Sequence, residues 1–76
     1  MRHLIEDIAK AIVDHPAQVR VHGVEGESAV IIELAVAKED VGKIIGKEGR
    51  TIRAMRTILH ATRVQKDKRH VLEVLE

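Results

Sequence analysis

The 76-residue sequence predicts an α+β fold. Apolar residues recur at helical spacing near the N-terminus and again after residue 50, which favours amphipathic helices. Between these stretches, valines and isoleucines alternate with polar residues over two short runs, as in paired strands. Glycines at positions 46 and 49 then separate a short helical pattern from a longer one. This length and pattern predict one small domain, residues 1–76.

The first helix is expected to end near Asp14, because Pro16 forces His15 out of helical geometry. A strand over residues 18–24 follows, with a turn at 25–27 that makes a hairpin with the next strand. That second strand should be central, because both of its faces are apolar. Its expected inner face consists of Val30, Ile32, Leu34 and Val36.

A short helix is predicted over residues 38–45, with Glu39 and Asp40 in its first turn, where negative charge is favoured. Gly46 ends it. A longer helix should run from Arg50 to about residue 65. The last apolar residues, at positions 71, 72, 74 and 75, fit a strand or a short helix equally well by spacing.

We use the name glycine loop for the four residues Gly46, Lys47, Glu48 and Gly49. Glycine lets the backbone turn where a Cβ atom would clash, and the loop leads into a helix start. Unpaired N–H groups and the positive end of the helix dipole can hold an anion there. Lys47 and Arg50 add mobile cations, so the loop is predicted to bind phosphate.

The run Ile45-Gly46-Lys47-Glu48-Gly49-Arg50-Thr51-Ile52 resembles the KH-domain signature Ile-Gly-x-x-Gly-x-x-Ile, whose loop clamps the backbone of single-stranded nucleic acid. More narrowly, the chain resembles the bacterial stand-alone KH proteins of the KhpA type. The resemblance implies a type II KH domain of order α-β-β-α-α-β. The last segment is then a strand parallel to the central one, since the crossover is right-handed. The result is a three-stranded mixed sheet with the helices packed on one face.

The same resemblance implies which residues bind RNA. Phosphate partners would be the glycine loop with Arg50 and Arg53. A groove beside the loop would hold the bases, with Val71 or Leu72 opposite. One wall of this groove would be lined by Val41, Gly42, Ile44 and Ile45. Plain core packing is an equally good reading of Val41 and Ile44 taken singly.

Charge is segregated along the chain. Residues 1–37 hold three basic and six acidic side chains, residues 38–70 hold ten and four, and residues 71–76 add two acidic ones. A basic block that coincides with the glycine loop suits a polyanion. The chain has no Phe, Tyr or Trp for base stacking, so modest affinity and weak sequence preference are expected.

Other functions fit the sequence less well. Residues 42–48 resemble a P-loop but have three residues between the glycines instead of four, and Glu48 stands where Ser or Thr would bind magnesium. A helix-turn-helix domain would need three packed helices, whereas here strands rich in β-branched residues are predicted on both sides of the helix pair. The histidines lack metal-ligand spacing, there is no Cys, and the single Ser28 has no base partner. We therefore expect no enzyme, metal or cofactor, and a cytoplasmic protein without signal peptide.

By resemblance, a KhpA-type protein acts as an RNA chaperone or post-transcriptional regulator linked to cell-wall homeostasis and cell shape, usually with a larger KH partner of the KhpB (Jag) type. The alternative is an adaptor whose KH fold serves dimerisation while the partner contacts RNA. The long helix is expected to carry a basic edge that continues from the loop along an RNA strand, formed by Arg53, Arg56, His60 and Arg63. A dimer surface is predicted on another side of this helix, away from its core residues and its basic edge, where two alanines flank one isoleucine: Ala54, Ile58 and Ala61. An isolated surface isoleucine is the simpler reading.

Overall fold

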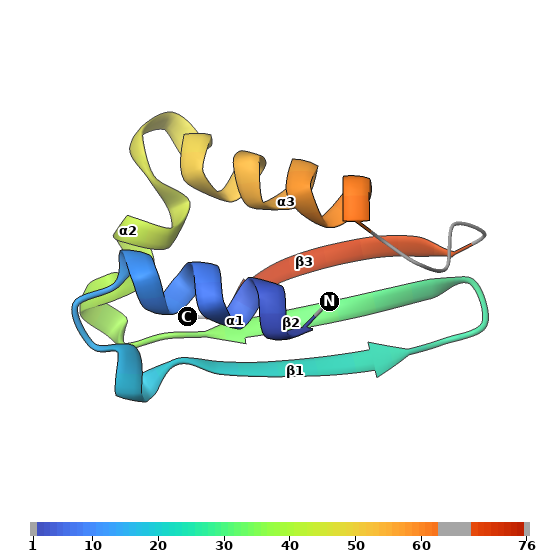
Figure 1. Cartoon of the computed structure of the whole chain (residues 1–76), viewed down its shortest axis with the longest axis horizontal. Coiled ribbons are helices and arrows are strands. Elements are labelled where there is room, and N and C mark those ends of the chain that lie inside the picture. The colour runs from blue at the N-terminus through green and yellow to red at the C-terminus, as the bar shows by residue number, and fades with distance from the viewer. Residues whose placement is uncertain (1, 63–67, 76) are drawn as a thin grey trace.

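The computed structural model describes residues 2–62 and 68–75, and it has the predicted element order (Figure 1). Short 3-10 turns precede β1, α2 and α3 at Pro16–Gln18, Lys38–Asp40 and Lys47–Gly49. The helices and strands are α1 (Arg2–Ile12), β1 (Arg20–Glu25), β2 (Ala29–Ala35), α2 (Val41–Ile45), α3 (Arg50–Thr62) and β3 (Arg69–Leu75).

The three strands form one mixed sheet in the order β1-β2-β3. β1 pairs antiparallel with β2 through the hairpin, and β3 pairs parallel with β2 after the two-helix crossover. The register places Val21 beside Leu34 and Ile32 beside Leu72. The predicted central strand, its antiparallel neighbour and the parallel last strand are therefore confirmed.

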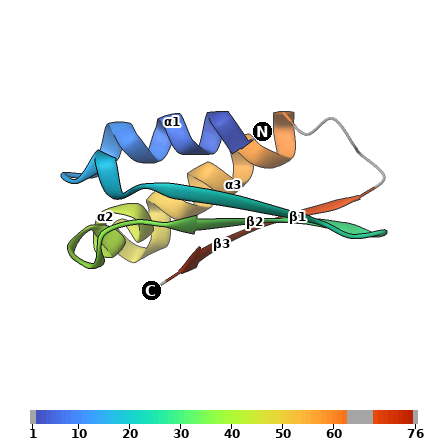
Figure 2. The same cartoon turned by 90° about the horizontal axis from the view of Figure 1, so that it is seen from below.

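The helices cover one face of the sheet, and Figure 2 shows α1 lying along that face. Ile32 and Leu34 of β2 and Leu72 of β3 point to this side and are almost fully buried. The helices contribute to the same core with Ile5 and Ala9 of α1, Ile44 of α2, and Ile52, Met55 and Leu59 of α3. The alternation of strand side chains and the helical stripes thus meet in one apolar layer, which stabilises the fold mainly by removing apolar surface from water.

Element ends differ slightly from the predictions. β1 begins at Arg20 instead of residue 18, because Pro16–Gln18 forms a 3-10 turn in which the N–H of Val19 donates to the carbonyl of Pro16. α3 is described as far as Thr62, and the predicted continuation to residue 65 lies outside the described residues.

Candidate nucleic-acid interface

The glycine loop connects α2 to α3 through three residues with positive φ. These are Gly46 at +77°, Glu48 at +56° and Gly49 at +74°. A Cβ atom at position 46 would overlap Thr51 Oγ1 and would lie 2.8 Å from the main-chain nitrogen of Thr51. Gly49 has open space around the same position. Gly46 is therefore required for both its conformation and its contact with the first turn of α3.

Most main-chain N–H groups of the loop have acceptors within the loop or in α2. Gly46 donates to the carbonyl of Gly42 at 2.9 Å, Gly49 donates to that of Gly46 at 3.1 Å, and Arg50 donates to that of Lys47. Among the described residues, the N–H groups of Lys47 and Glu48 have no main-chain acceptor. A helical residue followed by one in the left-handed region turns successive N–H groups toward one side, as in anion-binding nests.

Three cationic side chains surround this turn. Lys47 is exposed at its tip. The Nη2 atom of Arg50 lies 3.6 Å from Glu48 Oε1, and Arg53 donates from Nη2 to the carbonyl of Glu48 at 2.8 Å. The structure thus brings together the loop and both arginines that were predicted as phosphate partners. It also shows that Glu48 already contacts each arginine.

The predicted wall formed by α2 is only partly available. Val41 is half-buried, and Gly42 and Ile45 are exposed. Ile44 is fully buried in the core between the sheet and α3, so its side chain cannot line a groove, and the prediction is wrong for this residue. Neighbouring isoleucines on a helix differ by about 100° in direction, which places only one of them outside.

The opposite side of the groove also differs from the prediction. The side chain of Leu72 is buried in the core, and Val71 lies beside Ile31 on the other face of the sheet. Two side chains of α3 instead reach the edge of β3. Arg56 donates from Nη2 to the carbonyl of Leu72 at 3.2 Å, and His60 bonds through Nε2 to the carbonyl of His70 at 3.0 Å.

These bonds alter the basic edge expected along α3. The sequence places Arg53, Arg56, His60 and Arg63 on one stripe, but Arg56 and His60 hold main-chain carbonyls of the edge strand. Arg63 lies outside the described residues. Within the described part of α3, only Arg53 of this stripe reaches the glycine loop. The candidate phosphate site is therefore concentrated at the loop.

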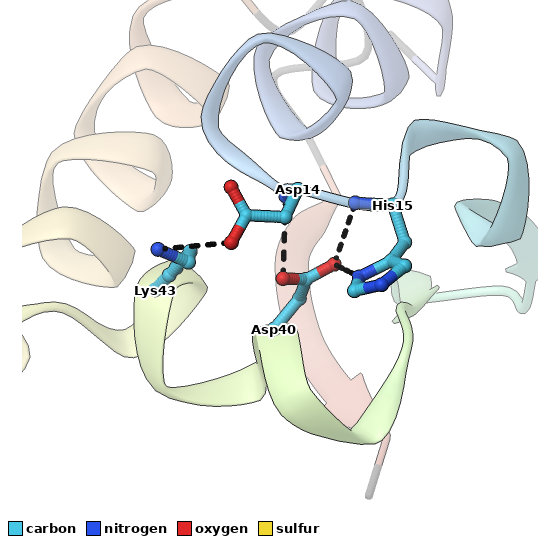
Figure 3. Close-up of polar contacts among 4 residues, drawn as sticks. All are labelled: Asp14, His15, Asp40 and Lys43. Atoms are coloured by element: carbon cyan, nitrogen blue, oxygen red, sulfur yellow. Dashed lines mark hydrogen bonds and ion pairs between the residues drawn. The ribbon is translucent and has the colours of Figure 1, made fainter.

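A buried carboxylate lies between the end of α1 and the start of α2 (Figure 3). Asp40, immediately before α2, has no exposed surface. Its carboxylate accepts hydrogen bonds from the N–H of Asp14 at 3.2 Å, the N–H of His15 at 3.0 Å and His15 Nδ1 at 3.1 Å. Lys43 adds an ion pair with Asp14 at 3.3 Å. The end of α1 is thereby joined to the start of α2.

The surroundings of Asp40 lower the pKa of its carboxyl group. Burial by itself would raise the pKa of this carboxyl, but the hydrogen bonds from Asp14 and His15, together with the charge of the His15 ring, outweigh it and hold the pKa below its ordinary value. From the sequence, Asp40 is expected only to favour the helix dipole in the first turn, and its hydrogen bonds to Asp14 and His15 were not predicted. Its partners are remote in sequence, and no local motif indicates them.

The predicted dimer surface is exposed. Ala54 and Ala61 are exposed on α3, and Ile58 keeps 38% of its surface accessible. The core stripe on the same helix is buried, with Ile52, Met55 and Leu59 between 0% and 5% exposed. The separation of these two stripes agrees with the prediction, whereas a contact with a second chain stays a prediction.

The family model described as KhpA/KhpB, KH domain, matches residues 2–74. The chain belongs to the KhpA/KhpB KH-domain family. It is 49% identical over 75 residues to a protein of Clostridium acetobutylicum named RNA-binding protein KhpA, covering 99% of this chain and 100% of that protein.

Two further KhpA relatives match over nearly their full lengths. The protein named RNA-binding protein KhpA in Aquifex aeolicus is 49% identical over 76 residues, covering 100% of this chain and 96% of that protein. The protein of the same name in Chlamydia pneumoniae is 47% identical, with 100% and 97% covered. No solved structure matches the chain. The predicted family and the type II KH order are confirmed.

The KhpA/KhpB family is not enzymatic, so the non-enzyme prediction is confirmed. Within residues 2–62 and 68–75, no cluster of three or more His, Cys, Asp or Glu side chains is arranged to hold a metal ion. The helices in the same ranges include none with the length and apolar character needed to cross a membrane.

Proposed function

We propose that this chain, acting as a single KH domain, binds single-stranded RNA through the glycine loop. The observation that carries this proposal is the pair of N–H groups at Lys47 and Glu48 without main-chain acceptors, at a turn surrounded by Lys47, Arg50 and Arg53. Such a turn suits a phosphate oxygen, because main-chain donors fix its position and the side chains neutralise its charge. The names of the relatives point to the same ligand.

Bases would lie beside the loop against α2. The exposed Gly42 and Ile45 and the half-buried Val41 offer aliphatic contact there. Without aromatic side chains, stacking energy of about 1–3 kcal/mol per base is missing. We therefore expect weak binding with little sequence preference, dominated by phosphate contacts and falling with salt.

A double substitution tests the site. Replacing Lys47 and Glu48 together by Asp should abolish binding of a short single-stranded oligouridylate, because a second carboxylate replaces a cation beside the phosphate position. The fold should be retained, since both residues are exposed and Asp tolerates positive φ. Fluorescence anisotropy measures binding, and circular dichroism measures the fold.

The matched control is Lys10→Asp, which makes the same change of charge on α1, where Lys10 pairs with Glu6. This control should bind RNA with an affinity close to that of the unmodified chain. Unchanged RNA affinity in the loop variant, or an equal loss in both variants, would place the RNA site elsewhere.

We further propose that the exposed stripe of Ala54, Ile58 and Ala61 forms a dimer contact, either with a second copy or with a larger KH partner of the KhpB (Jag) type. Two linked RNA sites would raise avidity without new contacts in either. The corresponding cellular role is that of a cytoplasmic RNA chaperone or post-transcriptional regulator, connected with cell-wall homeostasis and cell shape.

The second candidate is an adaptor in which the KH fold mainly supplies this dimer contact while the partner contacts RNA. The ion pair of Glu48 with Arg50 favours it, since it reduces the cationic character of the site. Crosslinking and sequencing of cellular RNA bound to the chain, with and without the co-expressed partner, distinguishes the two. An adaptor would crosslink to RNA only when the partner is present.

A further inference from the structure

Glu48 places a carboxylate inside the candidate phosphate site. It is the acidic residue of a loop that otherwise carries Lys47 and leads into Arg50. Its Oε1 atom lies 3.6 Å from Arg50 Nη2, and both side chains are mostly exposed. A carboxylate oxygen and a phosphate oxygen use the same donors of a guanidinium group. Glu48 therefore occupies a position that a phosphate would also use.

The backbone of Glu48 is held in place from the other side. Its φ of +56° lies in the left-handed region, and among described residues it is the only non-glycine with positive φ. Arg53 Nη2 donates to the Glu48 carbonyl at 2.8 Å, which favours this conformation. A strained residue within a binding loop persists where neighbouring contacts determine it. The main chain of Glu48 is held by the Arg53 hydrogen bond, and its carboxylate lies beside Arg50.

We propose that Glu48 is an internal competitor for phosphate: its carboxylate pairs with Arg50 in the free protein, and an RNA phosphate displaces it on binding. This inference rests on the proposed RNA function and adds an affinity-determining residue to it. Glu48 lowers the affinity of the site by satisfying part of Arg50 beforehand and by repelling the incoming anion. Release of the bound strand becomes faster for the same reason, since the carboxylate can return to Arg50.

The expected size of this effect follows from the exposure of the pair. Exposed ion pairs are weak and screened by salt, so removing the competitor should raise RNA affinity by roughly twofold to fivefold at low salt. The gain should shrink as the Debye length falls from about 14 Å at 50 mM salt to about 7 Å at 200 mM. A purely structural effect of the substitution would not follow the salt concentration in this way.

Glu48→Gln is the direct test, because it removes the charge and keeps the shape of the side chain. Affinity for a labelled single-stranded oligouridylate is measured by anisotropy at low and moderate salt. Glu27→Gln is the matched control: Glu27 is exposed in the β1–β2 turn, at the other end of the molecule from the glycine loop (Figure 1). Glu48→Asp, which keeps the charge and the tolerance for positive φ, should gain less affinity than Glu48→Gln, because a carboxylate stays in the loop.

A double-mutant cycle links the gain to Arg50. In the Arg50→Gln background, Glu48→Gln should raise affinity less than it does in the unmodified chain, because the pairing with Arg50 is gone and only the repulsion of the incoming phosphate remains. Such a reduced gain supports direct competition for Arg50. A gain of the same size with and without Arg50, or an equal gain from Glu48→Gln and Glu27→Gln, overturns the proposal and leaves only a general effect of net charge.

The outcome also separates this inference from the proposed function. If the double Asp variant of the loop loses RNA while Glu48→Gln gains nothing, the RNA site stands and the competitor does not. If the double Asp variant binds RNA normally, or the unmodified chain binds none, both proposals are wrong.

Discussion

At the scale of single residues, the two glycines of the loop have similar φ angles but different surroundings. Gly46 faces Thr51 at close range, whereas a Cβ atom at Gly49 would meet nothing within 4 Å. A side chain at either position strains the backbone, but only at position 46 does it also collide with α3.

We therefore expect Gly46→Ala to lower the free energy of unfolding by about 2–4 kcal/mol, from backbone strain and overlap together. Gly49→Ala should cost only about 1–2 kcal/mol, from its left-handed backbone alone. Urea unfolding followed by circular dichroism measures both values. Equal losses in the two variants would mean that the loop moves away from Thr51 without cost.

At the scale of elements, the join between α1 and α2 depends on the ionised Asp40. Its pKa is lowered in the folded protein, so its contribution to stability is fully present above the ordinary Asp pKa of about 3.9. That contribution is lost as the pH falls through the lower folded-state pKa. Asp40→Asn should accordingly lower the melting temperature at pH 7, and the difference from the unmodified chain should narrow below about pH 4.

Thermal unfolding over a series of pH values checks this expectation. Glu39→Gln is the control, because Glu39 is exposed and lies next to Asp40 in the same turn. It should leave both the melting temperature and its acid dependence nearly unchanged. A pH-independent deficit in the Asp40→Asn variant would show that shape, and not the charge of Asp40, holds the two helices together.

Most of the helices and strands could be predicted from periodicity, but the contacts between them could not. The alternation in β2 and the helical stripes of α3 identify a buried side because each repeat depends only on local geometry. The pairs of apolar residues in β3 suit either a helix or a strand, and pairing with β2 decides between them. The contacts of Asp40 with His15 and of Arg56 with Leu72 join remote parts of the chain, and single-sequence patterns carry no signal for them.

At the scale of the whole molecule, the exposed stripe on α3 bears on how so small a chain stabilises itself. A domain of this length buries a modest part of its surface, and a second subunit would add to that burial. Helices cross closely where small residues meet, so Ala54 and Ala61 would allow two α3 helices to approach around Ile58. In an antiparallel pair centred on Ile58, the glycine loops would lie roughly 27 Å apart along the helices, at opposite ends.

Ile58→Asp should convert this dimer to a monomer with unchanged secondary structure, because it introduces two carboxylates into an apolar contact. RNA affinity should fall with it, since the two loops would no longer act together. Val24→Asp is the control: it makes a comparable change at another exposed apolar side chain, in β1 and not on α3, and it should leave the dimer intact. Light scattering measures the mass, and anisotropy measures RNA binding. If the unmodified chain is already monomeric at high micromolar concentration, and binding to a KhpB-type partner survives Ile58→Asp, then α3 is not the interface and each glycine loop must bind RNA alone.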